Sequence, residues 1–119
     1  MRTWLCALLL LSAGAAWAGE ADVVAAEAYR ASDGTWRFDV TVRHDDTGWE
    51  HYADRWDVVS PAGEVLATRV LLHPHENEQP FTRSLGGVAV PEGVTRVIIR
   101  AHDNVHGRGG QTVEVPLAE

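Results

Sequence analysis

The chain is poor in sulfur and in positive charge. It has one cysteine, Cys6, and one methionine, Met1, and all ten of its basic residues are arginine, so lysine is absent. Neither a disulfide nor a cluster of thiolate or thioether ligands can form within it. The formal net charge of −7 at pH 7 argues against nucleic acid and against an anionic membrane surface as partners, because both attract basic patches.

Residues 1–18 have the features of a cleaved signal peptide. A short positive start at Arg2 precedes the apolar run 4–11, which is too short to cross a bilayer, and Ala16-Trp17-Ala18 forms an A-x-A cleavage site. A lipoprotein would carry cysteine directly after that site, whereas position 19 is Gly19. The pattern predicts a periplasmic or secreted protein that begins at Gly19, with an uncleaved N-terminal anchor as the alternative.

Cleavage would leave residues 19–119 as a single domain. That segment has 101 of the 119 residues, enough for one modest core, and it has nine arginines against seventeen acidic residues, a net charge of −8. It holds no cysteine, and no stretch in it approaches the length of a membrane span.

Seven short runs with strand character follow the signal, separated by turn residues. In the clearest run, 36–43, the residues Trp36, Phe38, Val40 and Val42 alternate with polar residues, the period of two that a half-buried strand shows. The other runs are expected at 20–31, 52–60, 65–72, 81–85, 94–101 and 111–117. Their number and spacing predict an all-β, seven-stranded antiparallel sandwich of the immunoglobulin or fibronectin III type, without a substantial helix after the signal.

The six histidines are expected to meet at one end of this sandwich. If successive strands run in alternating directions, the segments after the second, fourth and sixth runs lie at the same end, and the turns at the opposite end hold no histidine. The converging residues are His44, His51, His73, His75, His102 and His106. Imidazole nitrogen without sulfur favours copper(II) or zinc, so this end is a candidate metal site.

Side-chain alternation ranks these histidines. If Trp56, Ile99 and Leu72 face inward, His51, His102 and His73 face outward. In an immunoglobulin-like order the third strand lies between the fourth and the sixth, which places those three in one row across adjacent strands. His75 lies on the same side because Pro74 favours extended backbone. His73, His75, His102 and His51 therefore rank first, His106 on its glycine-rich loop comes next, and His44 is last because its alternation points into the core. Acidic neighbours that can orient the rings or complete the shell are Asp45, Asp46, Asp54, Glu76, Glu78 and Asp103.

Three segments resemble known proteins. Residues 48–54 (GWEHYAD), 73–84 (HPHENEQPFTRS) and 101–107 (AHDNVHG) are similar to segments of small uncharacterised exported bacterial proteins with an immunoglobulin- or fibronectin-like β-sandwich. The resemblance covers most of the chain after the signal and implies that fold, but it implies no activity.

Two functions of different class fit these features. The first is a metal-binding factor that takes copper(II) or zinc and no other cofactor. The second is a non-catalytic interaction module whose loops bind an envelope protein or a glycan. An enzyme is not expected, since the chain has neither a G-x-S-x-G nor an H-E-x-x-H motif.

Overall fold

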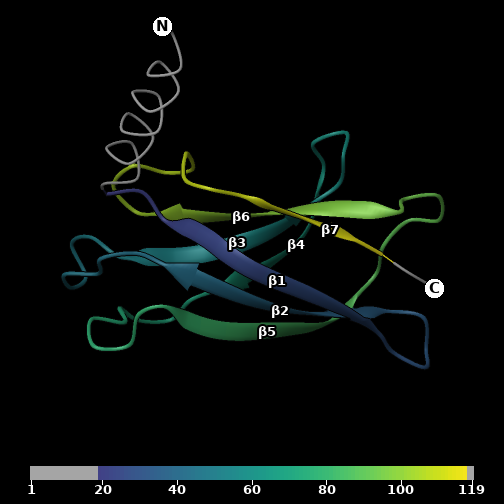
Figure 1. The fold of residues 1–119 in the computed structure, drawn as a ribbon, viewed down its shortest axis with the longest axis horizontal. Coiled ribbons are helices and arrows are strands. Elements are labelled where there is room, and N and C mark those ends of the chain that lie inside the picture. Colours follow the sequence, from purple (N-terminus) through teal and green to yellow (C-terminus); the bar gives the residue numbers. More distant parts are fainter. Residues whose placement is uncertain (1–18, 118–119) are drawn as a thin grey trace, which may run out of the picture.

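The computed structural model describes residues 19–117, so the expected signal peptide at 1–18 lies outside the described residues. Seven strands make up the architecture of that part of the chain (Figure 1). Their bounds are β1 Asp22–Arg30, β2 Trp36–Arg43, β3 Ala53–Val59, β4 Val65–Val70, β5 Phe81–Val88, β6 Arg96–Asp103 and β7 Val113–Pro116.

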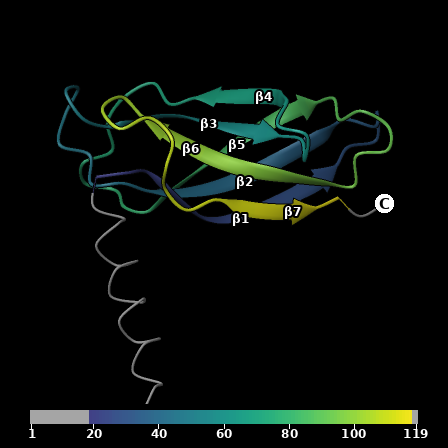
Figure 2. The same cartoon turned by 90° about the horizontal axis from the view of Figure 1, so that it is seen from above.

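The strands form two sheets that pack face to face. One sheet has the order β1-β2-β5 and the other β4-β3-β6-β7, and every pairing is antiparallel. Figure 2 shows the two layers from above. The predicted seven-stranded sandwich is confirmed, and so is the expected position of β3 between β4 and β6. Within residues 19–117 there is no helix of the length and apolarity that a membrane crossing requires.

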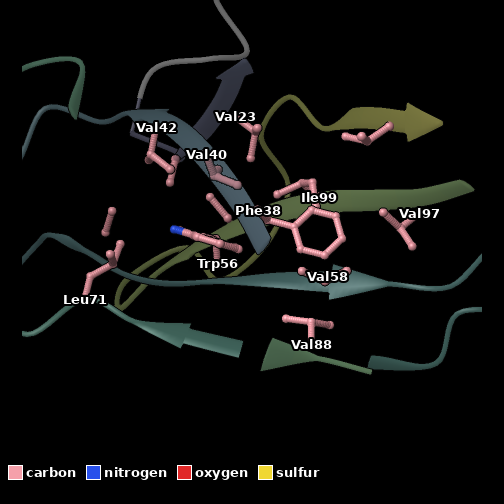
Figure 3. Close-up of a cluster of buried hydrophobic side chains, with 14 of the residues drawn as sticks. Val23, Phe38, Val40, Val42, Trp56, Val58, Leu71, Val88, Val97 and Ile99 are labelled. Carbon is pink, nitrogen blue, oxygen red and sulfur yellow. The ribbon is translucent and has the colours of Figure 1, made fainter. Parts of the chain in front are cut away.

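Alternating side chains from both sheets build the core (Figure 3). On β2, Phe38, Val40 and Val42 are completely buried, as the period-two pattern predicts, and Trp56 of β3 and Ile99 of β6 meet them from the other sheet. Burying side chains of this size stabilises a fold by about 1.5–3 kcal/mol each. This core fixes the position of one sheet relative to the other and thereby fixes the strand ends that carry the histidines.

The inward facing expected for Val70 and Leu72 was wrong. Val70 and Leu72 are 55% and 74% exposed, whereas Leu71 between them is 2% exposed and belongs to the core. The cause is the register of β4, which pairs Val70 with Arg55 on the outer face of β3. Because β4 is an edge strand of its sheet, its outer face carries apolar residues that the sequence pattern assigns to the core.

Three loops and the start of the described chain lie at one end of the sandwich, at the left of Figure 1. The loops are 44–52, 71–80 and 104–112, which connect β2 to β3, β4 to β5 and β6 to β7. All six histidines lie in these loops or at the adjoining end of β6, so their expected convergence on one end is confirmed.

Candidate metal site

Two histidines and one aspartate form the group of possible metal ligands in residues 19–117. The ligand atoms of His44, His51 and Asp103 all lie within 4.8 Å of one another. His44 Nε2 is 3.2 Å from His51 Nε2, which in turn is 3.0 Å from Asp103 Oδ2. The third separation, from His44 Nε2 to Asp103 Oδ2, is 3.9 Å. His44 and Asp103 are buried, and His51 is partly exposed.

The sheet topology brings these residues together from distant parts of the sequence. His44 follows β2 directly, and Asp103 is the last residue of β6. Asp103 pairs with Ala53 at the first position of β3, so the turn that precedes β3 lies beside the end of β6. Within that turn His51 N–H donates to Gly48 O at 3.2 Å and Thr47 N–H donates to His51 O at 3.0 Å. These bonds hold the His51 ring over the end of the sandwich.

The separations of the three ligand atoms suit a small divalent transition metal. A circle through three atoms that lie 3.2, 3.0 and 3.9 Å apart has a radius of about 2.0 Å, which matches zinc–nitrogen and zinc–oxygen bonds of about 2.0–2.2 Å. An ion at or near the centre of that circle would therefore reach all three atoms without a rearrangement of the backbone.

A backbone oxygen lies beside the same group. Gly19 O is 3.1 Å from His44 Nε2 and 3.1 Å from His51 Nε2. Ligand atoms of a tetrahedral site with bonds near 2.05 Å lie about 3.3 Å apart. The Gly19 carbonyl thus accepts a hydrogen bond from His51 Nε2 and lies at ligand spacing from both ring nitrogens.

Asp46 orients the His44 ring from the other side. Its Oδ1 accepts a hydrogen bond from His44 Nδ1 at 2.6 Å and from the backbone N–H of Ala53 at 3.1 Å, and its Oδ2 accepts from the backbone N–H of His75 at 2.6 Å. Because an ionised carboxylate only accepts hydrogen bonds, Nδ1 of His44 carries the hydrogen, and Nε2 faces His51 and Gly19. A carboxylate behind a histidine is the usual partner of a metal-ligating ring.

Asp103 is a completely buried carboxylate with uneven hydrogen bonding. Its Oδ2 accepts from the backbone N–H groups of Val105 and His106 at 3.2 and 2.9 Å and lies within 3.1 Å of nitrogens of the His51 and His106 rings. Its Oδ1 is buried and has no hydrogen-bond partner among residues 19–117. A buried charged oxygen without a partner is costly, and a bound cation would offset that cost.

Burial and hydrogen bonding oppose each other in setting the pKa values of the site. Burial alone lowers the pKa of His44, but the hydrogen bond and charge of Asp46, with smaller contributions from Gly19 O and Asp103, raise it overall. Burial alone raises the pKa of Asp46 and of Asp103, and hydrogen bonds to each carboxylate reverse that effect and lower both pKa values. The two carboxylates therefore remain ionised at neutral pH.

The structure places the other predicted site residues around this group. The His106 ring lies 4.9 Å from the His51 ring, centroid to centroid, and its Nδ1 is 3.1 Å from Asp103 Oδ2. His102 Nδ1 bonds to Asp54 Oδ1 at 2.6 Å instead. Neither His106 nor His102 supplies a ligand atom to the group of three.

His73 and His75 lie on a different part of the same end. They line an open hollow with Arg69, Leu71, Leu72 and Arg83. His75 was expected to face outward with His73, but it is buried and stacks on Phe81 at 3.9 Å between ring centroids. Burial, with the charges of Arg83 and His73, lowers the pKa of His75. The expected row of His73, His51 and His102 therefore does not form a ligand group among the described residues.

Sequence reasoning ranked His44 last and missed the Gly19 carbonyl. His44 does face inward, as its alternation predicts. At the end of β2, however, an inward side chain lies beneath the loops and not in the apolar core. Asp46, Asp54 and Asp103 were expected to orient rings or complete the shell, and each contacts a histidine ring. A backbone oxygen such as Gly19 O leaves no signal in residue type.

The segment that carries Gly19 is held against the β6–β7 loop. Val23 N–H donates to Gln111 O at 2.8 Å, and Gln111 N–H donates to Asp22 Oδ1 at 2.7 Å. Ala21, which precedes Asp22, is buried. Gly110 permits this close approach, since a Cβ at that position would lie 2.0 Å from Ala21 O.

Replacing Gly110 with alanine is therefore expected to destabilise this contact. The new methyl would overlap a backbone oxygen, a clash that typically costs about 1–3 kcal/mol of unfolding free energy. Gly86→Ala is the matched control, because a Cβ there meets only the Arg37 Cγ at 3.9 Å. Urea unfolding of both variants is the measurement; equal stability of the two would show that the Ala21–Gly110 contact is not tight in solution.

Comparison with known proteins gives one informative relative. A protein of Halomicrobium mukohataei named "Putative lipoprotein" is 47% identical over 96 residues, which cover 81% of this chain and 47% of that protein. The chain thus spans about half the length of the curated relative that it matches. No protein-family model matches the chain, and no solved structure matches it.

Proposed function

We propose that this chain is an exported β-sandwich protein that binds one divalent transition metal ion through His44, His51 and Asp103. One observation carries the proposal: three possible ligand atoms from three separate segments lie on a circle whose radius, about 2.0 Å, is close to the length of a metal–ligand bond. The buried Asp103 carboxylate supports it, because its Oδ2 supplies negative charge beside the two rings and its Oδ1 has no hydrogen-bond partner among the described residues.

Copper(II) and zinc are the metals that fit this set of ligands. Two imidazole nitrogens and a carboxylate oxygen suit both ions, and the absence of nearby sulfur disfavours copper(I). In the metal-free protein His51 Nε2 lies 3.0 Å from Asp103 Oδ2 and 3.1 Å from Gly19 O, two acceptors, so it carries a hydrogen that a bound ion would displace. The partly exposed His51 ring gives the ion a route to solvent, as a metal carrier or metal buffer requires.

Export is part of the proposal. The A-x-A site before Gly19 supports it, and the name of the Halomicrobium relative, a lipoprotein, describes an exported class of protein. Position 19, where a lipoprotein would carry its lipidated cysteine, is glycine. We therefore propose cleavage between Ala18 and Gly19 and release into the periplasm or the medium.

Calorimetric titration of the protein that begins at Gly19 tests the metal site. We expect saturable binding of one equivalent of copper(II) or zinc, weakened at least tenfold, about 1.4 kcal/mol, by His44→Ala or Asp103→Asn. His73→Ala and His102→Ala are the controls, since neither ring contributes to the group of three. If only the control variants lose binding, the ligands are those of the expected outer row; if the unmodified protein takes up no metal at micromolar concentration, the proposed function is wrong.

A protein- or glycan-binding module is the second candidate function. Three apolar side chains are exposed on the three loops at the histidine end: Trp49 at 64%, Leu72 at 74% and Val105 at 56%. Exposed aromatic and aliphatic side chains of this kind often contact partners. The same surface would then act without metal, and we propose no enzymatic activity for either function.

A further inference from the structure

Removal of the expected signal peptide would leave a free α-amino group on Gly19. We propose that cleavage before Gly19 completes the metal site, because the released α-amino group binds the same ion as His44, His51 and Asp103 and makes the mature site selective for copper(II). The proposal rests on the proposed metal-binding function and adds a ligand, a metal preference and a dependence on processing.

Gly19 lies in the middle of the histidine cluster. Its carbonyl oxygen is 3.1 Å from Nε2 of both His44 and His51. A Cβ on Gly19 would lie 2.7 Å from Cε1 of the His106 ring, so the residue packs directly against a third imidazole. Its φ of 93° also favours glycine. Any group on the Gly19 backbone is therefore within a few ångströms of the candidate ion position.

The contacts of the next residues keep Gly19 in this position. Ala21 is buried, and the backbone of Val23 bonds to Gln111 O at 2.8 Å. Asp22 Oδ1 accepts from Gln111 N–H at 2.7 Å. These contacts involve residues after the cleavage point, so hydrolysis of the Ala18–Gly19 bond leaves all of them intact.

Cleavage changes the chemistry of one atom of the site. A signal peptidase adds water across the Ala18–Gly19 peptide bond, which leaves a carboxyl group on Ala18 and an amino group on Gly19. The peptide nitrogen of the uncleaved chain has no free lone pair for a metal, whereas a neutral amine has one. The amine and the carbonyl oxygen of one residue can also close a five-membered ring around an ion.

The completed set of ligands favours copper(II). Two imidazole nitrogens, one amine nitrogen and the carboxylate oxygen of Asp103 form a mixed nitrogen–oxygen set, which suits tetragonal copper(II). Copper(II) also lies at the top of the affinity order for such ligands, above zinc. Addition of the amine should therefore raise copper(II) affinity more than zinc affinity.

The absence of lysine makes this amine directly observable. All ten basic residues are arginine, so the α-amino group is the one primary amine of a chain that begins at Gly19. Acetylation by an N-hydroxysuccinimide ester, followed by mass spectrometry of the N-terminal peptide, reports on that group alone. One equivalent of copper(II) is expected to slow acetylation at least tenfold in the mature protein and to slow it less in Asp103→Asn, which keeps the amine and loses a ligand.

A one-residue extension separates this proposal from the metal site itself. The form that retains Ala18 keeps His44, His51 and Asp103 but converts the Gly19 amine into a peptide nitrogen. We expect it to bind copper(II) at least tenfold more weakly than the form that begins at Gly19, with a smaller loss for zinc. If both forms bind copper(II) equally and acetylation is not slowed, the amine is not a ligand, while binding that still depends on Asp103 keeps the proposed function. If neither form binds metal, both proposals fail.

Discussion

Replacing Asp46 with alanine is expected to lower the free energy of unfolding of the metal-free protein by about 3–5 kcal/mol. The carboxylate is buried and accepts three hydrogen bonds, from the His44 ring and from the backbone N–H groups of Ala53 and His75. Its removal leaves those donors buried without an acceptor, and each unsatisfied donor costs about 1–3 kcal/mol. The three partners come from the β2 end, the β3 start and the β4–β5 loop, so the loss affects the whole histidine end.

Chemical denaturation of Asp46→Ala against Asp45→Ala measures this effect. Asp45 is the exposed neighbour, so its replacement changes the charge equally and should alter stability by less than about 0.5 kcal/mol. Loss of the carboxylate behind His44 should also weaken metal binding by about 10–100-fold. A stable Asp46→Ala protein with unchanged metal affinity would show that Asp46 neither holds the loops nor orients the ring.

The fold was predictable because its core follows a local rule. The alternation of Trp36, Phe38, Val40 and Val42 depends only on neighbouring residues, and the structure buries all four. Turn residues between short runs similarly indicated the number of strands and their antiparallel order. The common end of the six histidines followed from counting strands, which needs no knowledge of exact strand bounds.

The membership of the candidate site was not predictable by the same rule. Directly after β4, Leu71 and not Leu72 enters the core, and this shift by one residue removed the basis for the expected outer row. His75 stacks on Phe81, a contact set by the path of a loop that alternation does not describe. Distances between strand ends from different sheets, such as His44 and Asp103, arise only from tertiary packing.

The start of the described chain illustrates the same limit. The sequence identifies Gly19 only as the residue that follows an A-x-A site. Its place beside His44 and His51 depends on the contact of Ala21 and Asp22 with residues 110–111, which lie about 90 positions away in the sequence. The A-x-A site and the candidate ligands are therefore connected through the fold and not through any motif.

Metal binding is expected to raise the melting temperature of the protein that begins at Gly19 by roughly 10–20 °C when free metal is at about 100 times its dissociation constant. At that concentration, binding to the folded state alone adds about 2.7 kcal/mol of stability. The ligands come from the end of β2, the turn before β3 and the end of β6, and the unfolded chain does not hold these segments together, so the ion favours the folded state.

Scanning calorimetry with copper(II), zinc and a chelator is the measurement. The shift should disappear in chelator and, at the same metal concentration, should fall to about half or less in Asp103→Asn. His73→Ala, which removes an exposed ring outside the group of three, should retain it in full. A shift of equal size in all three proteins would mean that the ion binds elsewhere. Because the ion would connect segments of both sheets at one end, the shift would report directly whether His44, which follows β2, and Asp103, at the end of β6, hold the same ion.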